Sequence, residues 1–514
     1  MTKMPNRFSE LSVRLSALLD RAPSEAVEQA REIDLDTPER INLMSLRATI
    51  LVDGGSLTKQ QDAIEEGLAL FRELHDLFPT ADVTYNLANG IVAATGNPPR
   101  DASWLDYQER TREQRAEARR CYWKAAQDPE ASASLRTQAW TNLANQFGNS
   151  YRLGEAHDAR LAALAIDPEN GVAASSAAHA LLWLFEQGGC SDLTRVEAIM
   201  LAKIAHRNQD RIVEYAGAQA AREIAEFASE LGEPPARSLH TDPFIRWVER
   251  ERLTLAPVVE LVDPALGKLD WLTLPGILER HSGAGGTPPP VFAMFNVLKC
   301  DFILARDLAW RATDESVWPT TGRFADTLDF ATYGPDASAL VLAHRTALDL
   351  LDKVAVTANH YFEFGQPPEK VYFGKLWRGT ADKATGIRSL AGAVEATVRS
   401  GVGALYGLVE LADDYEEKSG ILRSQKELRN AGTHRFVVLH DLGDPANSRQ
   451  APEVEHHRRE QFNQEVLRAL RVARSAIQML ALSISQNEKG LAQRTSGLVG
   501  TLTVPDHDWI RGRT

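Results

Sequence analysis

The chain has 514 residues, a formal net charge of −13 and 25% charged residues. It is too long for a single hydrophobic core, so its length predicts two or three domains. The acidic balance argues against a protein that coats nucleic acid with its whole surface, although a small basic cleft is compatible with it.

The first 25 residues carry charges throughout, and no stretch approaches the roughly 20 apolar residues of a membrane span. We therefore expect a soluble, cytoplasmic protein without a signal peptide. Three cysteines, Cys121, Cys190 and Cys300, lie far apart without a CxxC pair, which excludes a disulfide framework or a thiolate zinc site. We expect neither a metal nor another cofactor.

Residues 10–235 predict helices only, because Gly and Pro separate apolar runs of helical period. Residues 133–168 predict a helical hairpin that ends at Asp167-Pro168 and resembles a tetratricopeptide repeat. An earlier Asp128-Pro129 lies 39 positions before it, which exceeds the roughly 34-residue period of such repeats. Residues 1–240 therefore predict a degenerate repeat-like domain. Such arrays usually bind a protein partner, although the helices could merely enlarge the scaffold.

Residues 241–290 predict a proline-punctuated connector, and the sequence GAGGTPPP at residues 283–290 is the best candidate for a hinge. Its glycines do not form a phosphate-binding loop, because no Lys-Ser/Thr pair follows them and no strand precedes them.

Residues 291–490 predict four strong helices in an up-and-down bundle, followed by a tail at 491–514, so the expected fold is all-α. The last helix carries an apolar stripe, and the third is expected to break at Gly420. The insert at residues 444–461 predicts a polar loop. Its His456-His457 pair is expected to be solvated.

Residues 426–444 contain the pattern that carries chemistry. Arg429 and His434 flank four residues, Asn430, Ala431, Gly432 and Thr433. A histidine can move a proton to or from a ribose oxygen, and a guanidinium can stabilise charge on a phosphate. Five residues rotate an ideal helix by about 140° net, so the pair would point to different sides. The sequence therefore predicts a helix break at Gly432.

Three segments in this order, DFILARDL at 301–308, LDKVAVTANHYF at 351–362 and LRNAGTHRF at 428–436, resemble the HEPN superfamily. This superfamily comprises helical bundles with an arginine, a polar residue and then a histidine after about four to six intervening positions. The resemblance covers residues 241–488. The same order of segments is found in a bacterial subfamily in which the bundle follows helical repeats, and the chain resembles it. Gly432 and Thr433 differ from the leucine and acidic residue that relatives often carry, and Phe436 replaces a tyrosine found in some toxins.

The resemblance implies a metal-independent endoribonuclease. The 2′-hydroxyl would attack the adjacent phosphate and leave a 2′,3′-cyclic phosphate and a 5′-hydroxyl. It also implies a homodimer in which two copies of Arg429 and His434 line one cleft. The expected biological role is a toxin or antiviral defence effector, which the N-terminal repeats regulate in response to a trigger. The alternative is a non-catalytic interaction protein that binds a partner or a nucleotide.

Further residues are expected to assist this site. Asn430 is expected to contact the phosphate or fix the histidine tautomer, and Asp352 to support the cleft together with its neighbours Asp349 and Lys353. Three basic residues are candidates for RNA binding, with a solvated basic face as the alternative: Arg423, Lys426 and Arg435. His440, Asp441 and Asp444 are expected to terminate a helix rather than to bind a metal.

Overall fold

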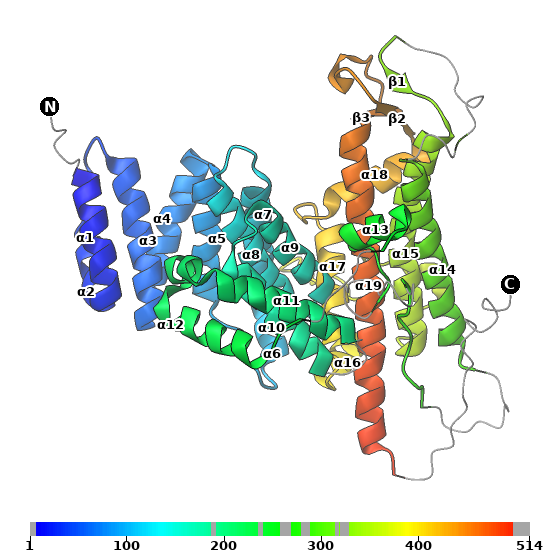
Figure 1. The fold of residues 1–514 in the computed structure, drawn as a ribbon, viewed down its shortest axis with the longest axis horizontal. Helices are drawn as coiled ribbons and strands as arrows, with labels where there is room; N and C mark the ends of the chain where they lie inside the picture. Colours follow the sequence, from blue (N-terminus) through cyan, green and yellow to red (C-terminus); the bar gives the residue numbers. More distant parts are fainter. Residues whose placement is uncertain are drawn as a thin grey trace. The chain divides into compact units, whose positions relative to one another are not determined.

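The computed structural model describes residues 7–186, 192–234, 240–256, 269–278, 288–313, 318 and 328–496. Most of the hinge predicted at residues 283–290 and most of the tail predicted at 491–514 lie outside these ranges. The described chain is helical apart from one small sheet, which confirms the all-α prediction (Figure 1). No helix in these ranges is long and apolar enough to cross a membrane.

The chain divides into two compact units. Unit 1 comprises Met1–Ser150, Glu155–Ala236 and Glu417–Ile421, and unit 2 comprises Tyr151–Gly154, Arg237–Glu416 and Leu422–Thr514. The first unit is built from successive helices. They are α1 (Arg7–Arg21), α2 (Pro23–Arg31), α3 (Arg40–Thr58), α4 (Gln61–Leu77), α5 (Ala81–Thr95), α6 (Trp104–Arg110), α7 (Arg112–Gln127), α8 (Ala133–Gly148), α9 (Leu153–Ile166), α10 (Gly171–Glu186), α11 (Asp192–Arg207) and α12 (Gln209–Glu230).

Helices that are neighbours in the sequence pack against each other from α1 to α5. Small residues allow this close approach: a Cβ atom added to Gly67 of α4 would lie 2.8 Å from the carbonyl oxygen of Ala48 on α3. Side-chain caps begin two of the helices, because the oxygens of Thr80 and Ser132 accept the N–H groups of Val83 and Leu135. The predicted hairpin at 133–168 corresponds to α8 and α9, while its membership of a tetratricopeptide array stays a prediction.

Unit 2 contains the other described elements, which are α-helices, β-strands and short 3₁₀-helices labelled η. They are α13 (Pro243–Arg250), α14 (Pro290–Arg311), β1 (Ala331–Thr332), α15 (Pro335–Tyr361), η3 (Pro368–Lys370), α16 (Gly392–Arg399), α17 (Ala404–Glu416), α18 (Arg423–His434), β2 (Phe436–His440), η4 (Pro445–Asn447), β3 (Val454–Arg458) and α19 (Arg459–Arg494).

The long helices α14, α15 and α19 pack side by side as the core of unit 2 (Figure 1). The apolar stripe predicted on the last helix is fully enclosed. Its members Phe462, Val466, Leu470, Ala473, Ile477, Leu480 and Ile484 are at most 1% exposed. The third predicted helix is three helices, α16, α17 and α18, and the break at Gly420 lies in the turn between the last two.

A three-stranded sheet with the order β1-β2-β3 lies at one end of this bundle (Figure 1). β2 runs antiparallel to β1 and parallel to β3. The prediction of a polar loop at residues 444–461 is therefore wrong for β3 and for the start of α19. The segment has little apolar character, so its strand depends on pairing with β2 rather than on a pattern in its own sequence.

Two buried arginines fix segments to the bundle of unit 2. Arg306 of α14, within DFILARDL, makes two hydrogen bonds of 2.8 and 2.6 Å with Asp270 of the connector. It also donates to the carbonyl of Leu253 at 2.8 Å. The fully buried Arg152, in the four-residue segment Tyr151–Gly154 of the same unit, pairs with Asp414 of α17 at 2.5 Å. Because both arginines are enclosed, removal of a carboxylate partner would weaken the compensation of a buried charge.

A buried hydrogen bond joins α18 to α15. Nε2 of His344 donates to Oε1 of Gln425 at 3.0 Å, and Gln425 in turn donates to Glu465 of α19. Burial lowers the pKa of His344 to about 4, the bond to Gln425 opposes this shift, and the nearby His457 adds to it. His344 is therefore neutral in the folded protein at neutral pH.

We expect His344 to make unit 2 less stable in acid. The unfolded histidine takes up its proton as the pH falls through about 6.5. The folded one does so only near pH 4. The neutral form of His344 therefore contributes fully to stability above about pH 6.5, and this contribution is lost as the pH falls to about 4. The total loss is about 3 kcal/mol.

Urea unfolding at about pH 7 and about pH 4.5 measures this loss. The His344→Gln variant should show a smaller decrease than the wild type, whereas His360→Gln, at an exposed position of the same helix, should not. Equal decreases in all three proteins would contradict the assignment.

Candidate functional site

Arg429 lies on the side of α18 that packs against α15. Its Nε donates to Asp349 at 2.8 Å and its Nη2 to Asp352 at 3.0 Å. Asp352 also accepts the backbone N–H of Phe373 at 2.8 Å, so it holds the guanidinium and the following loop together. Asp352 thus pairs with Arg429, while its supporting role in a catalytic site stays a prediction. The contacts with Asp349 and Asp352 leave Nη1 outside both ion pairs.

The surroundings of Arg429 keep it charged. Burial alone would lower the pKa of its guanidinium, but Tyr415, Asp352 and Asp349 outweigh that effect and raise the pKa above its ordinary value. Tyr415 of α17 is buried beside it, and burial raises the pKa of this phenol to about 12 although the charge of Arg429 opposes the shift. Tyr415 is the member of the cluster that sequence analysis missed, because nothing in its neighbourhood links it to the motif.

His434 is the last residue of α18 and is exposed. Asn430, also exposed, precedes it by four residues, and residues four apart lie on one face of a helix. An amide at this position is within reach of the imidazole or of a ligand bound to it. The histidine and the asparagine therefore form a solvent-facing pair at the end of the helix.

Gly432 does not break the helix, so the predicted bend is wrong. α18 runs without interruption from Arg423 to His434. A Cβ atom on Gly432 would lie 3.3 Å from side-chain atoms of both Val341 and Arg345, so the glycine allows α18 to lie close to α15. On an unbroken helix Arg429 and His434 differ by about 140° in direction. One chain therefore turns the arginine towards α15 and the histidine towards solvent.

The three residues predicted to bind RNA are all in ion pairs. Arg423 pairs with Glu427 at 2.8 Å, Lys426 with Glu416 at 2.5 Å and Arg435 with Glu455 at 2.6 Å. Each positive charge is thus balanced locally, so their role in RNA binding stays a proposal. Lys353, a candidate for the cleft, pairs with Asp301 of α14.

An open hollow of about 730 Å³ lies where α18 passes into β2. Arg345 of α15 and Gly432, Arg435 and Phe436 line it together with Tyr333. Nε of Arg345 is enclosed without a hydrogen-bond partner among the described residues, and Phe436 is 71% exposed. Sequence analysis missed Arg345, because only the packing of α15 against α18 places it beside the motif.

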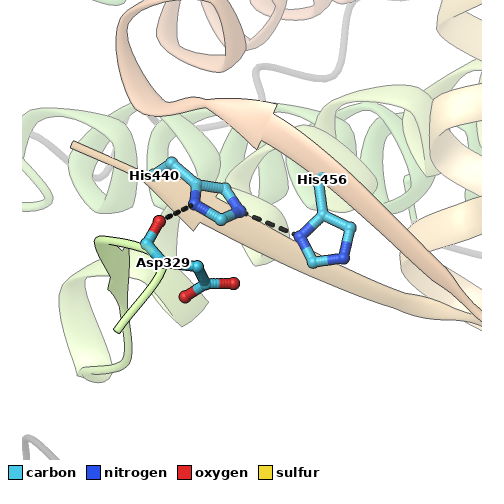
Figure 2. A group of neighbouring side chains, drawn as sticks. All are labelled: Asp329, His440 and His456. Carbon is cyan, nitrogen blue, oxygen red and sulfur yellow. Dashed lines mark hydrogen bonds between the residues drawn. The ribbon is translucent and has the colours of Figure 1, made fainter. Parts of the chain in front are cut away.

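The predictions for residues 440–457 need correction. The chain there ends a strand, not a helix: His440 closes β2, Asp441 pairs with Arg459 at 2.8 Å, and Asp444 caps η4. His456 is not a solvated loop residue but part of β3. Figure 2 shows its ring beside that of His440, with the Nδ1 of His456 2.9 Å from the Nε2 of His440.

Asp329 lies beside these two histidines (Figure 2). Its backbone oxygen is 2.9 Å from the Nδ1 of His440. One possible metal-ligand atom from each of Asp329, His440 and His456 lies within 4.8 Å of the others. This cluster was not predicted, because Asp329 is more than 100 residues from His440 in the sequence.

Residues 283–487 match the model of a protein family described as LA2681-like HEPN. The match contains α14, α15, α18 and most of α19, and with them Arg429, His434, Asp349 and Asp352. The search of curated proteins found no match.

The two carboxylates that hold Arg429 should differ in their contribution to stability. Asp349→Ala removes one partly exposed ion pair, which should lower the free energy of unfolding by about 1 kcal/mol. Asp352→Ala also removes the acceptor of the Phe373 N–H, so it should cost about 2 kcal/mol.

Urea unfolding of the single variants and of the same changes in an Arg429→Gln background measures this difference. In that background the effect of Asp349→Ala should nearly disappear, whereas Asp352→Ala should keep the cost of the lost backbone contact. Equal effects at both positions would show that the bond to Phe373 contributes nothing.

Proposed function

Residues 283–487 form an LA2681-like HEPN domain, and we propose that this domain makes the protein a metal-independent endoribonuclease. HEPN families are generally RNase-like. The observation that carries the proposal is the arrangement on α18, where an exposed His434 follows an Arg429 that two carboxylates hold and keep charged. A mobile proton and a fixed positive charge are what transesterification at a ribose phosphate requires.

In this mechanism His434 takes the proton of the ribose 2′-hydroxyl. The 2′-oxygen attacks the adjacent phosphorus, and the P–O5′ bond breaks to give a 2′,3′-cyclic phosphate and a 5′-hydroxyl. The proton that the leaving oxygen needs comes from a protonated imidazole. Arg429 offers Nη1 to the phosphate, since neither ion pair uses that group. Asn430 orients His434 or the phosphate from the adjacent turn.

We propose that the nuclease acts as a homodimer of the HEPN domain. Arg429 and His434 point about 140° apart on one helix, and HEPN domains often dimerise. A second copy would bring its own histidine and arginine, which together supply a proton acceptor, a proton donor and two guanidinium groups.

The hollow beside Arg345 is the proposed path of the RNA chain. Arg345 forms no ion pair within the described residues, so it can accept a phosphate without losing another partner. The exposed ring of Phe436 lies in the same hollow. Base stacking on such a ring is worth about 1–3 kcal/mol. Arg423, Lys426 and Arg435 would contribute only if phosphate replaces their carboxylate partners.

Cleavage of labelled single-stranded RNA in excess EDTA tests the proposal. The wild-type protein should cut, and His434→Ala should lower the rate by about 10²- to 10⁴-fold while RNA binding is retained. Arg345→Ala should instead weaken binding. His360→Ala is the control, because this exposed histidine lies about 16 Å along α15 from Asp349.

Three results would contradict parts of this proposal. Loss of cleavage in EDTA would show that the reaction requires a metal ion and would contradict the proposed mechanism. Equal cleavage rates for His434→Ala and wild type would show that His434 takes no part in catalysis. An absence of cleavage at concentrations that permit dimers, with cellular activators supplied, would favour the alternative of a helical interaction protein that binds a partner or a nucleotide.

We further propose that the protein is a toxin or antiviral defence effector whose N-terminal helices bind a controlling partner or trigger. The support is the series of paired helices α1–α5, a type of array that commonly presents a protein-binding surface. A chain that begins at residue 98 lacks these helices but keeps Tyr151–Gly154, and so keeps Arg152 with Asp414 in unit 2.

Expression of this shortened chain should slow cell growth more than expression of the full chain does, because the helices proposed to control the nuclease are missing. The His434→Ala change should abolish the effect in both. Growth curves at matched protein abundance measure it. Equal or lower toxicity of a soluble shortened chain would count against control by these helices.

A further inference from the structure

We propose that Asp329, His440 and His456 bind one divalent transition-metal ion of the Zn²⁺ class. The three residues come from the segment before β1, from β2 and from β3 (Figure 2). The inference does not rest on the nuclease proposal.

The register of the sheet brings the two histidines together. Val438 of β2 is paired with His456 of β3. Side chains alternate along a strand, so His440, two residues after Val438, lies on the same face as His456. Ala331 of β1 is the partner of His440 on the other side, and Asp329 precedes it by two residues. The small sheet thus places an acid and two imidazoles at one point.

Hydrogen bonds fix the protonation of His440. The carbonyl oxygen of Asp329 can only accept, so the Nδ1 of His440 donates to it at 2.9 Å. The Nε2 of His440 therefore carries a lone pair, and it faces the Nδ1 of His456 at 2.9 Å. A histidine that donates one N–H to a backbone carbonyl and offers its other nitrogen has the usual arrangement of a metal ligand.

Metal binding requires only a change of tautomer at His456. Between the two rings, the Nδ1 of His456 donates its proton to the Nε2 of His440. An ion would replace that shared proton, and the Nε2 of His456 would take up a proton from solvent in exchange. The net proton change is zero, and both rings bind as neutral ligands. The carboxylate of Asp329 is held by Ser448 Oγ at 3.2 Å and by the Ala331 N–H at 3.3 Å. Such contacts orient a ligand.

The donor set selects the class of metal. Two imidazoles and a carboxylate suit Zn²⁺ and related ions, whereas Mg²⁺ and Ca²⁺ prefer sites made of oxygen ligands. Three protein ligands leave a coordination position for water. The ion would fasten three short strands that share few hydrogen bonds, one of which follows α18 directly.

Calorimetric titration of the full-length, untagged protein with ZnCl₂ after EDTA treatment and dialysis tests the site. We expect one ion per chain and a rise in the thermal unfolding temperature on zinc addition. His456→Ala and Asp329→Asn should each weaken binding by at least about tenfold. His457→Gln is the matched control, because this neighbouring histidine lies on the other face of β3.

Absence of stoichiometric binding by the wild type would overturn the proposal, and so would equal zinc affinity of His456→Ala and His457→Gln. Tight binding that only His456→Ala and Asp329→Asn weaken would support it. RNA cleavage in EDTA reports separately on the nuclease proposal, because that reaction uses no metal. Failure of one proposal therefore leaves the other intact.

Discussion

The attachment of α18 to α15 determines what the candidate site can do. Asp349 and Asp352 hold the guanidinium of Arg429, and the buried bond between His344 and Gln425 fixes the same two helices about one turn away. Gly432 permits their close approach near the end of α18. Rotation of α18 about its axis would break all of these contacts together. The direction in which His434 leaves the bundle is therefore set by groups other than His434 itself.

The helices and the position of the motif could be predicted from the sequence, because both depend on residues that are close together in the chain. The stripe from Phe462 to Ile484 repeats every three or four residues, and burial of such a face is its only stable arrangement. Arg429, His434 and Asp352 could be named because the spacing and the resemblance mark them. Whether Arg429 and His434 catalyse a reaction stays a prediction.

Contacts between distant segments could not be predicted in the same way. β3 pairs with β2 although its sequence, VEHHR, has the polar composition of a loop. Arg345 and Tyr415 join the site only through the packing of α15 and α17 around α18. The bend expected at Gly432 failed for a related reason: glycine permits both a break and a close helix contact, and only the position of Val341 and Arg345 decides between them.

The charge around Arg429 has a consequence for substrate binding. One guanidinium and two carboxylates give this cluster a formal charge of −1, so a phosphate that approaches it meets no net attraction from these groups. Positive potential must come from other residues. Arg345 has no carboxylate partner among the described residues and lies in the hollow next to Gly432, and a second copy of the domain would bring the same groups again. Asp349 and Asp352 thus fix the geometry of Arg429, but the cluster that they form with it does not attract RNA. Attraction of the RNA and positioning of the guanidinium would therefore depend on different residues.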